Sequence, residues 1–506
     1  MKIPNGEEWR MVDVRKWSGD LHKLIYTHVL LIGVPTIFYY CLRLGGLTLI
    51  NVHVAIATFF LLSSLVIFLE GSSALFRRFA IDDIKQPTTG WLDRFLRSLK
   101  SSLGISGYRL PPSRSPLPRC SFLVAAYLPN EQDIILDTVR HILSTVQRSA
   151  AGLELILAYN TPFDLPVEED LRRLTQIYPE LHLLRVEGSH SKAENLNAAL
   201  KIVTGELTCI LDADHHPQPD CFFRAWRWLE HDYDVVQGRN IIRNHSFNLL
   251  TQNIAVEFET LYGVSHAAKS FLTDSTIFGG SNGYWRTSVL KQIRFNPAML
   301  TEDIDASMRT LLSGYRILHD RSIVTTELAP VDFPSFWFQR KRWAQGWLEV
   351  SFKYQRRVWK SKKLTVLQKV YWTYLLYYCV LYSLIALQIL PLILSLFLYH
   401  GYLPPSDNPY LLFSTLVTFS SGIYQTLITM KVAAMRYSRI YFIQHAALIF
   451  IYTILKNMIA VVGLYDHLHG YNKWVVTPRG TQRQRDLPVR KPPVLTPTAA
   501  GIGSSK

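Results

Sequence analysis

Hydrophobic residues follow two different patterns along this chain. Four apolar stretches read clearly as helices that cross a membrane, at about residues 24–42, 47–69, 370–398 and 410–430, and a fifth, 440–464, is long enough but ambiguous. Residues 119–332 instead show short apolar runs that alternate with amphipathic stretches, which is typical of βαβ units. The pattern therefore predicts an α/β domain inserted between two groups of membrane-spanning helices.

Within the α/β domain the periodicity predicts individual elements. Strands are expected at 121–126, 153–158, 181–186 and 208–211, and helices at 131–147, 167–178 and 193–203. This order fits the nucleotide-binding half of a sheet. The remainder of the domain is more irregular, and we expect it to hold the half that binds an acceptor.

The flanking segments complete the predicted organisation. A transmembrane hairpin occupies residues 1–70, and a basic linker with a proline-rich end, 71–118, joins it to the α/β domain. Residues 333–365 mix Trp and Phe with Arg and Lys, which is typical of amphipathic helices at a membrane surface. A C-terminal transmembrane region, 366–465, precedes a tail, 466–506, that ends in a Pro-, Thr- and Gly-rich segment expected to be disordered.

The distribution of basic residues predicts the orientation in the membrane. Lys and Arg flank the outer ends of the first two spans, whereas the loop 400–409 between the later spans contains neither. The positive-inside rule then describes an integral plasma (inner) membrane protein whose N-terminus and α/β domain are cytoplasmic. The stretch 440–464 is long enough to span but has basic residues at both ends and polar residues within it. We interpret it as re-entrant or interfacial, with the C-terminus inside.

Composition narrows the class of partner. The 506 residues include 54 Lys and Arg against 39 Asp and Glu, a formal net charge of +15. Such a charge fits nucleic acid, anionic lipid headgroups or an acidic small substrate. The apolar stretches favour membrane lipids, and without an RNA-binding signature no nucleic-acid partner is expected. Five scattered cysteines without a CxxC spacing predict neither a zinc site nor a disulfide framework.

The first candidate for chemistry is Asp212-Ala213-Asp214, at the end of a short apolar run. The run reads as a buried strand, so both carboxylates lie at its carboxyl end, where open α/β sheets bind ligands. Carboxylates two residues apart on extended backbone can bind one divalent cation. Asp pairs after strands are more often simple turn formers, so this tripeptide alone does not establish a metal site.

Other short motifs accompany it in a fixed order. They are Ser121–Glu131, Lys192–Asn197, Asp212–Asp214, Phe278–Asn282, Thr301–Asp303, Gln339–Trp343 and Trp474–Gly480. In order and spacing they resemble the membrane-embedded family 2 inverting glycosyltransferases, which include cellulose, chitin and hyaluronan synthases. The resemblance covers roughly residues 119–480. It implies a metal-dependent hexosyltransferase with a Rossmann-like GT-A domain inserted between transmembrane helices.

The resemblance also implies a role for each motif. Asp303 would act as the catalytic base with Glu302 beside it, and Asp212 and Asp214 would bind Mg²⁺ or Mn²⁺. The expected nucleotide-binding residues are Tyr127, Asn160, Lys192, Asn195 and Asp212. The expected diphosphate- and acceptor-binding residues are Gly280, Ser281, Gln339, Arg342 and Trp343. Trp474, Thr477 and Arg479 would belong to a gating loop.

Physical chemistry supports this assignment for Asp303 and leaves an alternative open. Inversion in one displacement needs a base to accept the proton of the acceptor hydroxyl. Apolar neighbours, Met299 and Leu300, and the adjacent Glu302 should raise the pKa of Asp303. Acidic residues at a helix start are also stabilised by the helix dipole, so Asp303 can simply belong to a helix N-terminus. Both interpretations can hold together.

Several other residues in or near these motifs can also be explained without a role in binding or catalysis. His215 and His216 precede Pro217 and are interpreted as turn residues rather than metal ligands. Arg340 and Lys341 can be no more than basic positions of a membrane-surface helix. Asn160 stands where the family usually carries an acidic residue, although an Asn can still donate and accept hydrogen bonds to uracil.

The leading functional prediction is a processive enzyme. It would polymerise a UDP-sugar, UDP-glucose by family frequency, into a β-linked polysaccharide at the cytoplasmic face and secrete it between its own spans. Tyr371, Tyr374, Tyr378 and Tyr382 share one face of the third span, and aromatic rings suit the apolar faces of sugars, although Tyr also forms interfacial belts. The alternative is a glycolipid synthase that adds one or a few sugars to a membrane lipid. A non-catalytic scaffold or transporter would need none of the carboxylates, and partner subunits are compatible with either enzyme.

Overall fold

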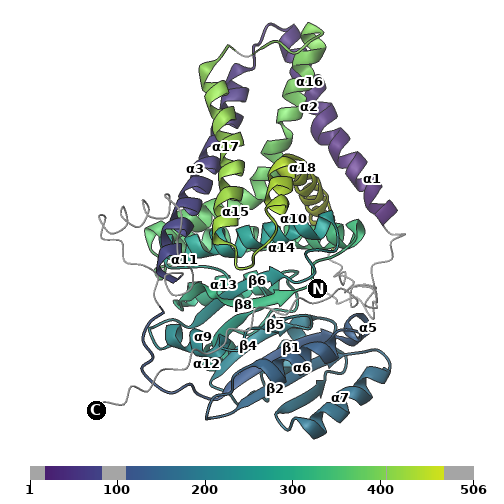
Figure 1. The fold of residues 1–506 in the computed structure, drawn as a ribbon. Helices are drawn as coiled ribbons and strands as arrows, with labels where there is room; N and C mark the ends of the chain where they lie inside the picture. Colours follow the sequence, from purple (N-terminus) through teal and green to yellow (C-terminus); the bar gives the residue numbers. More distant parts are fainter. Residues whose placement is uncertain (1–16, 82–109, 406, 472–506) are drawn as a thin grey trace, which may run out of the picture.

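The computed structural model describes residues 17–81, 110–405 and 407–471, and it separates into two layers (Figure 1). Apolar helices form the upper layer and a mixed sheet with its covering helices forms the lower layer. Helix α14 (Phe333–Lys360) runs across the boundary between them. Residues 82–109 of the expected basic linker and the whole expected gating loop lie outside the described residues.

The sheet has the strand order β3-β2-β1-β4-β7-β6-β8-β5. Its strands are β1 (Cys120–Tyr127), β2 (Leu153–Asn160), β3 (Leu181–Arg185), β4 (Leu207–Asp212), β5 (His216–Pro217), β6 (Val235–Ile242), β7 (Gly283–Arg286) and β8 (Ile317–Glu327). Strands β3, β2, β1 and β4 pair in parallel, and β7 is antiparallel to both of its neighbours. In the register, Ala125 pairs with Asp212 and Tyr127 with Asn160. The carboxyl ends of three strands therefore meet at one edge of the sheet.

Helices cover both faces of this sheet, which explains why strands such as β1 and β4 are largely apolar. Alternate side chains of β1 enter opposite cores: Phe122 and Val124 pack in one, Leu123 and Ala125 in the other. The first face is covered by α6 (Ile135–Thr145), α7 (Pro166–Ile177) and α9 (Cys221–Leu229). The second is covered by α8 (Lys192–Ala199), α12 (Thr287–Ile293), α13 (Glu302–Ser313) and part of α14.

The expected strands and the α/β class are confirmed, with differences at the helices. The expected helix 131–147 is two helices, α5 (Leu128–Glu131) and α6. The expected helix 193–203 ends at Ala199. The irregular remainder of the domain contains α10 (Leu249–Thr260), a π-helical segment η4 (Leu261–His266) and α11 (Ala267–Thr273), which follow one another directly.

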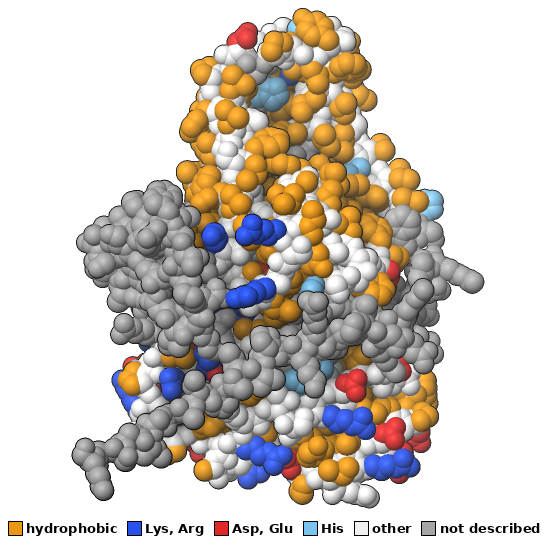
Figure 2. Space-filling view, viewed as in Figure 1, with side chains coloured by type: hydrophobic (Ala, Val, Ile, Leu, Met, Phe, Trp, Pro, Cys, Tyr) orange, Lys and Arg blue, Asp and Glu red, His pale blue; other side chains and the backbone are white. Residues whose placement is uncertain are grey.

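Five helical segments among the described residues are long and apolar enough to cross a membrane: Gly19–Leu44, Ile50–Phe76, Val380–His400, Pro409–Val432 and Arg439–Leu468. Figure 2 shows hydrophobic side chains covering most of the upper layer, whereas most of the visible charged side chains lie lower down. The N-terminal segment comprises α1 (Trp17–His28), η2 (Val29–Gly33) and α2 (Val34–Leu44). Together with the membrane-synthase motifs, these segments describe a membrane protein.

Two boundaries in the upper layer differ from those expected. Helix α3 (Ile50–Ile81) continues past residue 70, so the first part of the expected linker is helical. The expected single span 370–398 is two helices, α15 (Val366–Leu387) and α16 (Ile389–His400), with a break at Gln388. Pro391 explains the break, because proline has no N–H to donate to the carbonyl of residue 387. Helix α17 (Pro409–Val432) has nearly the expected bounds.

The segment expected to be re-entrant is instead a continuous helix, α18 (Arg439–Leu468). A re-entrant segment must reverse direction within the membrane, and α18 has no break at which to do so, so that alternative is wrong. Both ends of α18 contact elements at the base of the upper layer. His445 Nδ1 lies 3.1 Å from Asn253 Oδ1, while Asp466 accepts from Lys23 at 2.5 Å and pairs with Lys341 at 2.9 Å. These contacts favour the interfacial interpretation, which stays a prediction.

Candidate active site

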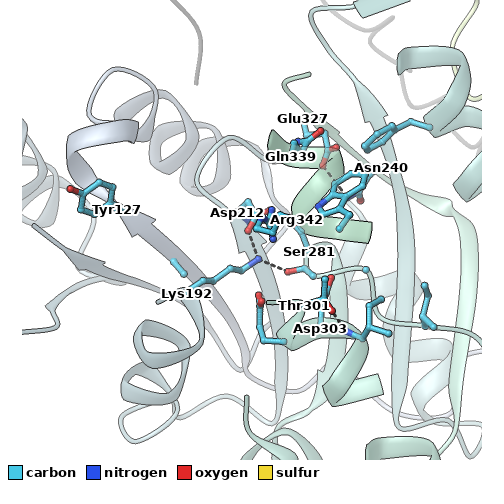
Figure 3. A pocket seen from close by; sticks show the side chains of 18 of the residues that line it. Tyr127, Lys192, Asp212, Asn240, Ser281, Thr301, Asp303, Glu327, Gln339 and Arg342 are labelled. Atoms are coloured by element: carbon cyan, nitrogen blue, oxygen red, sulfur yellow. Dashed lines mark hydrogen bonds and ion pairs between the residues drawn. The ribbon is translucent and has the colours of Figure 1, made fainter. Parts of the chain in front are cut away.

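A pocket opens between the carboxyl ends of β1, β2 and β4 and the helices α13 and α14 (Figure 3). The predicted site residues that line it are Tyr127, Asn160, Lys192, Asn195, Asp212, Gly280, Ser281, Glu302, Asp303, Gln339, Arg342 and Trp343. They come from motifs spread over more than two hundred residues of sequence. Asp214 is not part of the lining, and Trp474, Thr477 and Arg479 lie outside the described residues.

Lys192 links the strand end of β4 to the loop before β7. Its ammonium forms an ion pair with Asp212 Oδ1 and donates to the carbonyl of Gly280 at 2.7 Å. Ser281 Oγ accepts a hydrogen bond from the Asp212 backbone N–H at 3.2 Å. Burial would lower the pKa of Lys192, but the carboxylates of Asp212, Glu302 and Asp303 raise it, so this cation is retained in the pocket.

Asp303 lies directly against the backbone of Gly280. Gly280 has φ +87°, and a Cβ added there would be 2.8 Å from Asp303 Oδ2. A side chain at this position would therefore displace the carboxylate as well as strain the backbone. Burial raises the pKa of Asp303 to about 7, and the neighbouring Glu302 carboxylate adds to the rise, while Lys192 opposes it. A carboxyl group with this pKa can accept a proton near neutral pH.

The structure supports both interpretations of the Thr301–Asp303 motif. Helix α13 begins at Glu302, and Asp303 Oδ1 accepts a hydrogen bond from the Ile304 N–H at 2.9 Å. The first turn of the helix thus fixes the carboxylate while its other oxygen faces Gly280. On the opposite side, a Cβ on Gly346 of α14 would be 2.3 Å from the side chain of Thr301. The absence of a side chain at Gly346 lets α14 pack closely against the motif.

Behind Asp212 lies a buried group of acidic and imidazole side chains. The ligand atoms of Asp212, Asp214 and His215 all lie within 4.8 Å of one another. Asp214 Oδ1 is 3.0 Å from His215 Nδ1, and His215 Nε2 is 2.7 Å from Glu327 Oε2. Burial opposes ionisation of His215, yet the Glu327 and Asp214 carboxylates raise its pKa to about 9. The His215 side chain thus joins two carboxylates, and its N–H donates to the Asp212 carbonyl at 3.1 Å, so its interpretation as a turn residue is confirmed.

This donor set fits a divalent cation at Asp212. A hard cation prefers carboxylate oxygens, and Asp212 is the carboxylate of the pair that lines the pocket. Asp214 is fully buried and accepts a hydrogen bond from the Leu328 N–H at 3.0 Å. Asp214 would therefore contact a cation at Asp212 from the protein interior. His216 is separate from this group: its ring stacks on His141 with centroids 4.4 Å apart.

The predicted nucleotide-binding amides are tied to each other. Asn195 Nδ2 donates to Asn160 Oδ1 at 2.8 Å and to the carbonyl of Ala126 at 3.2 Å, and Asn160 Nδ2 donates to the carbonyl of Ser189 at 3.1 Å. Part of the hydrogen-bonding capacity of Asn160 is thus used within the protein. In Figure 3, Tyr127 lies at the left of the view, apart from the labelled group around Lys192 and Asp212.

Helix α14 supplies the remaining wall. Gln339, Arg342, Trp343 and Trp347 line the pocket from one face of this helix. Arg340 is buried among aromatic rings, pairs with Glu257 at 2.5 Å, and lies over the ring of Trp343 at 4.3 Å from its centroid. Burial would raise the pKa of Glu257, but Arg340 and Lys456 lower it to about 2. Arg340 is therefore more than a basic surface position, because it holds the ring of Trp343.

Several lining residues were not predicted from the sequence. They are Asn240, Phe258, Tyr262, His266, Glu327 and Trp347, among others. Glu327 is the last residue of β8, as Asp212 is of β4, but the preceding strand is too polar to mark it as Asp212 is marked. Tyr262 and His266 lie in a helix whose composition gives no sign of a binding role.

Comparison with known proteins places this geometry in a family. The family model described as glycosyl transferase family group 2 matches residues 207–461. Three curated relatives are a probable glucomannan 4-beta-mannosyltransferase 7 of Oryza sativa subsp. japonica, cellulose synthase 1 catalytic subunit [UDP-forming] of Komagataeibacter xylinus, and poly-beta-1,6-N-acetyl-D-glucosamine synthase of Staphylococcus aureus strain MSSA476. They are 26%, 27% and 27% identical over 277, 233 and 246 residues, which cover 54%, 43% and 48% of this chain. The matches span 46%, 31% and 58% of the relatives' own lengths.

A solved structure gives a weaker likeness. The mannosyltransferase PcManGT from Pyrobaculum calidifontis, in complex with GDP-Man and Mn²⁺, is 18% identical with a TM-score of 0.46, and the alignment covers 82% of this chain and 99% of that one. The family model, in contrast, covers half of the chain and includes the strand that ends in Asp212, the Asp303 helix and α14. The mixed α/β sheet agrees with the predicted GT-A fold. The chain belongs to glycosyl transferase family group 2.

Proposed function

We propose that this glycosyltransferase is processive and inverting, and that it polymerises a UDP-sugar into a β-linked polysaccharide at the cytoplasmic membrane face. The observation that carries the proposal is the position of Asp303. A buried carboxyl with a pKa of about 7 faces the same pocket as the Lys192–Asp212 pair, with only Gly280 between them. The pocket thus places a proton acceptor close to a cation that suits an anionic leaving group.

The proposed step follows from this arrangement. The acceptor hydroxyl attacks C1 of the donor sugar, the C1–O bond to the diphosphate breaks, and the hydroxyl proton passes to Asp303. Lys192 and the fork-shaped guanidinium of Arg342 neutralise the charge that develops on UDP. Mg²⁺ or Mn²⁺ held by Asp212, with Asp214 behind it, would supply further stabilisation of that charge. Attack from the face opposite the leaving group inverts the configuration.

The upper layer supports a polymeric product. Tyr374 and Tyr378 of α15 stack with ring centroids 5.0 Å apart, and Tyr378 and Tyr382 follow at 4.8 Å. Phe59 of α3 stacks on Tyr378 at 6.0 Å. These residues form a continuous aromatic ladder between two membrane helices, and aromatic faces suit the apolar faces of sugar rings. Relatives named as synthases of cellulose and poly-β-1,6-N-acetylglucosamine point the same way.

The donor is the part of the proposal that needs the most direct test. UDP-glucose is the first candidate, and the relative named as UDP-forming supports the uridine nucleotide. Full-length protein purified in detergent should be incubated with radiolabelled UDP-sugars and GDP-mannose, and the products sized before and after digestion with specific glycosidases. We expect a long product from one UDP-sugar, lost in Asp303→Asn. A short lipid-extractable product would instead identify a glycolipid synthase, and release of GDP alone would refute the choice of nucleotide.

A further inference from the structure

Helix α14 has an exposed face only near its C-terminal end. From Pro334 to Ser351 every side chain is buried or partly buried, where the helix runs between the sheet and the apolar helices (Figure 1). The exposed face begins at Phe352 and continues with Arg356, Trp359 and Lys360. These four positions are spaced i, i+4, i+7 and i+8, so they share one side of the helix.

The opposite face of the same segment is anchored in the protein core. Val350, Tyr354 and Val358 are fully buried in the cluster that packs on the second face of the sheet. The Tyr354 hydroxyl also donates to Asp305 of α13 at 2.7 Å. This packing fixes the rotation of the helix, so the exposed face points away from that core.

Five exposed basic side chains gather at this end of α14 and in its connection to α15, and we name them the α14 basic patch. They are Arg356, Arg357, Lys360, Lys362 and Lys363. None of the five has an ion-pair partner among the described residues, and the chain contains no acidic residue between Glu349 and Asp407. Asp274 contacts Gln368 of α15 only through its carbonyl, and its carboxylate pairs with Arg316 at 2.6 Å. The positive charge of the patch is therefore left without a protein counter-charge in this part of the molecule.

The α14 basic patch lies beside the ends of two apolar helices. Helix α15 starts at Val366, only Ser361–Thr365 separate it from α14, and Val366 and Leu367 are exposed at 73% and 58%. On the exposed face of α14, Phe352 stacks on His467 near the end of α18, with ring centroids 6.0 Å apart. Cations mixed with exposed aromatic and aliphatic side chains, next to candidate membrane spans, are typical of a surface in contact with lipid headgroups.

We propose that the α14 basic patch binds anionic phospholipid headgroups in the membrane leaflet next to the catalytic domain. Its guanidinium and ammonium groups contact phosphate oxygens, while the ring of Trp359 lies among the headgroups. A soluble polyanion would leave the apolar side chains of Phe352, Val366 and Leu367 in water, whereas a phospholipid contacts these side chains and the cations together. This inference is independent of the proposed glycan synthesis. It also restricts the headgroup contact expected over 333–365 to the last part of that segment.

The test reconstitutes full-length protein in phosphatidylcholine vesicles that contain either brominated phosphatidylglycerol or brominated phosphatidylcholine. Bromine quenches nearby tryptophan fluorescence, and comparison with Trp359→Phe isolates the signal of Trp359. Each cation near an anionic membrane surface contributes about fivefold to binding, so the patch should favour contact with phosphatidylglycerol. We expect half-maximal quenching of Trp359 to need about fivefold less brominated phosphatidylglycerol than brominated phosphatidylcholine, or less still.

A variant with four cations of the patch changed to Gln should lose this preference. Its substitutions are Arg356→Gln, Lys360→Gln, Lys362→Gln and Lys363→Gln. The matched control removes the same charge from exposed positions of the sheet domain and should keep the preference. Its substitutions are Arg140→Gln, Arg172→Gln, Arg173→Gln and Lys201→Gln. Lys360→Gln alone should shift the preference part of the way, which keeps the proposal testable if the fourfold variant does not insert.

Three results would overturn the proposal. Equal quenching by the two brominated lipids in the wild type would exclude the lipid site, and this result is expected if the cations bind an acidic protein segment or free phosphate instead. A preference lost equally in the patch variant and the control would assign it to net charge rather than to this surface. A preference that does not weaken as sodium chloride is raised would contradict its electrostatic basis.

Discussion

Replacing Asp303 with Asn tests the proposed base and also gives a stability prediction. Asn occupies nearly the same volume but cannot accept the acceptor proton at neutral pH. General-base catalysis contributes about 10²–10⁴-fold, so transfer should fall by that factor. UDP affinity should stay nearly constant, because the residue acts on the acceptor rather than on the donor.

The pH dependence follows from the same carboxyl group. With a pKa of about 7, Asp303 is about one-tenth ionised at pH 6, so kcat/KM of the wild type should be roughly tenfold below its plateau there. Glu302→Gln removes a negative charge that raises this pKa, so the rising limb of the profile should move to lower pH. A profile that is flat between pH 5 and 8 would refute Asp303 as the group that must be ionised.

Stability should change with the opposite sign to activity. Because the folded-state pKa of Asp303 lies above the ordinary value of 3.8, ionisation is unfavourable in the folded protein, and stability is lost as the pH rises from about 4 through about 7. The difference between 3.8 and about 7 corresponds to roughly 4 kcal/mol at most. Asp303→Asn should therefore raise the melting temperature in detergent at pH 8 and leave it nearly unchanged at pH 4.

Two outcomes would contradict this reasoning. Comparable losses of UDP affinity and turnover in Asp303→Asn would make Asp303 a structural residue of the α13 N-terminus, where its Oδ1 accepts from the Ile304 N–H. A melting temperature that rises equally at pH 4 and pH 8 would show that the gain does not come from ionisation. UDP titration calorimetry and radiolabel transfer on the same preparations separate these cases.

Further predictions concern the metal, the Trp343 wall and the C-terminal segment. Asp214→Ala should abolish both transfer and its dependence on divalent ions, and a wild-type enzyme that stays active with excess chelator would exclude a metal. Arg340→Met, which removes the cation over Trp343, should raise the acceptor KM about tenfold while the donor KM holds; equal changes in both would indicate general misfolding. Thr477→Ala with Arg479→Ala should cut turnover about 100-fold, whereas truncation after residue 487 should be tolerated; normal turnover in the double variant would exclude a gating role.

The sequence by itself determined the individual helices and strands, and the strand ends that carry site residues such as Asp212. Strand β4 could be predicted because an apolar run ends abruptly in Asp212, and burial on both faces of a sheet leaves that pattern in the sequence. The parallel register then brings Asp212 and Asn160 to the same edge as Tyr127. The spans were equally visible, because a membrane requires long apolar runs and neighbouring side chains have little influence on that requirement.

The tertiary structure decided which side chains meet across the elements. His215 is the turn residue that the sequence indicated, but only the fold places Glu327, over a hundred residues later, at 2.7 Å from its ring. Arg340 looked like a surface cation until α10 brought Glu257 to it. His266 gives no periodic signal, because it is neither part of an apolar stripe nor of a strand end, and the π-helical turn that directs it into the pocket depends on packing against α3 and α17. The periodicity of a single helix or strand is visible in its own sequence. These contacts join segments that lie far apart along the chain, so no local pattern in the sequence reveals them.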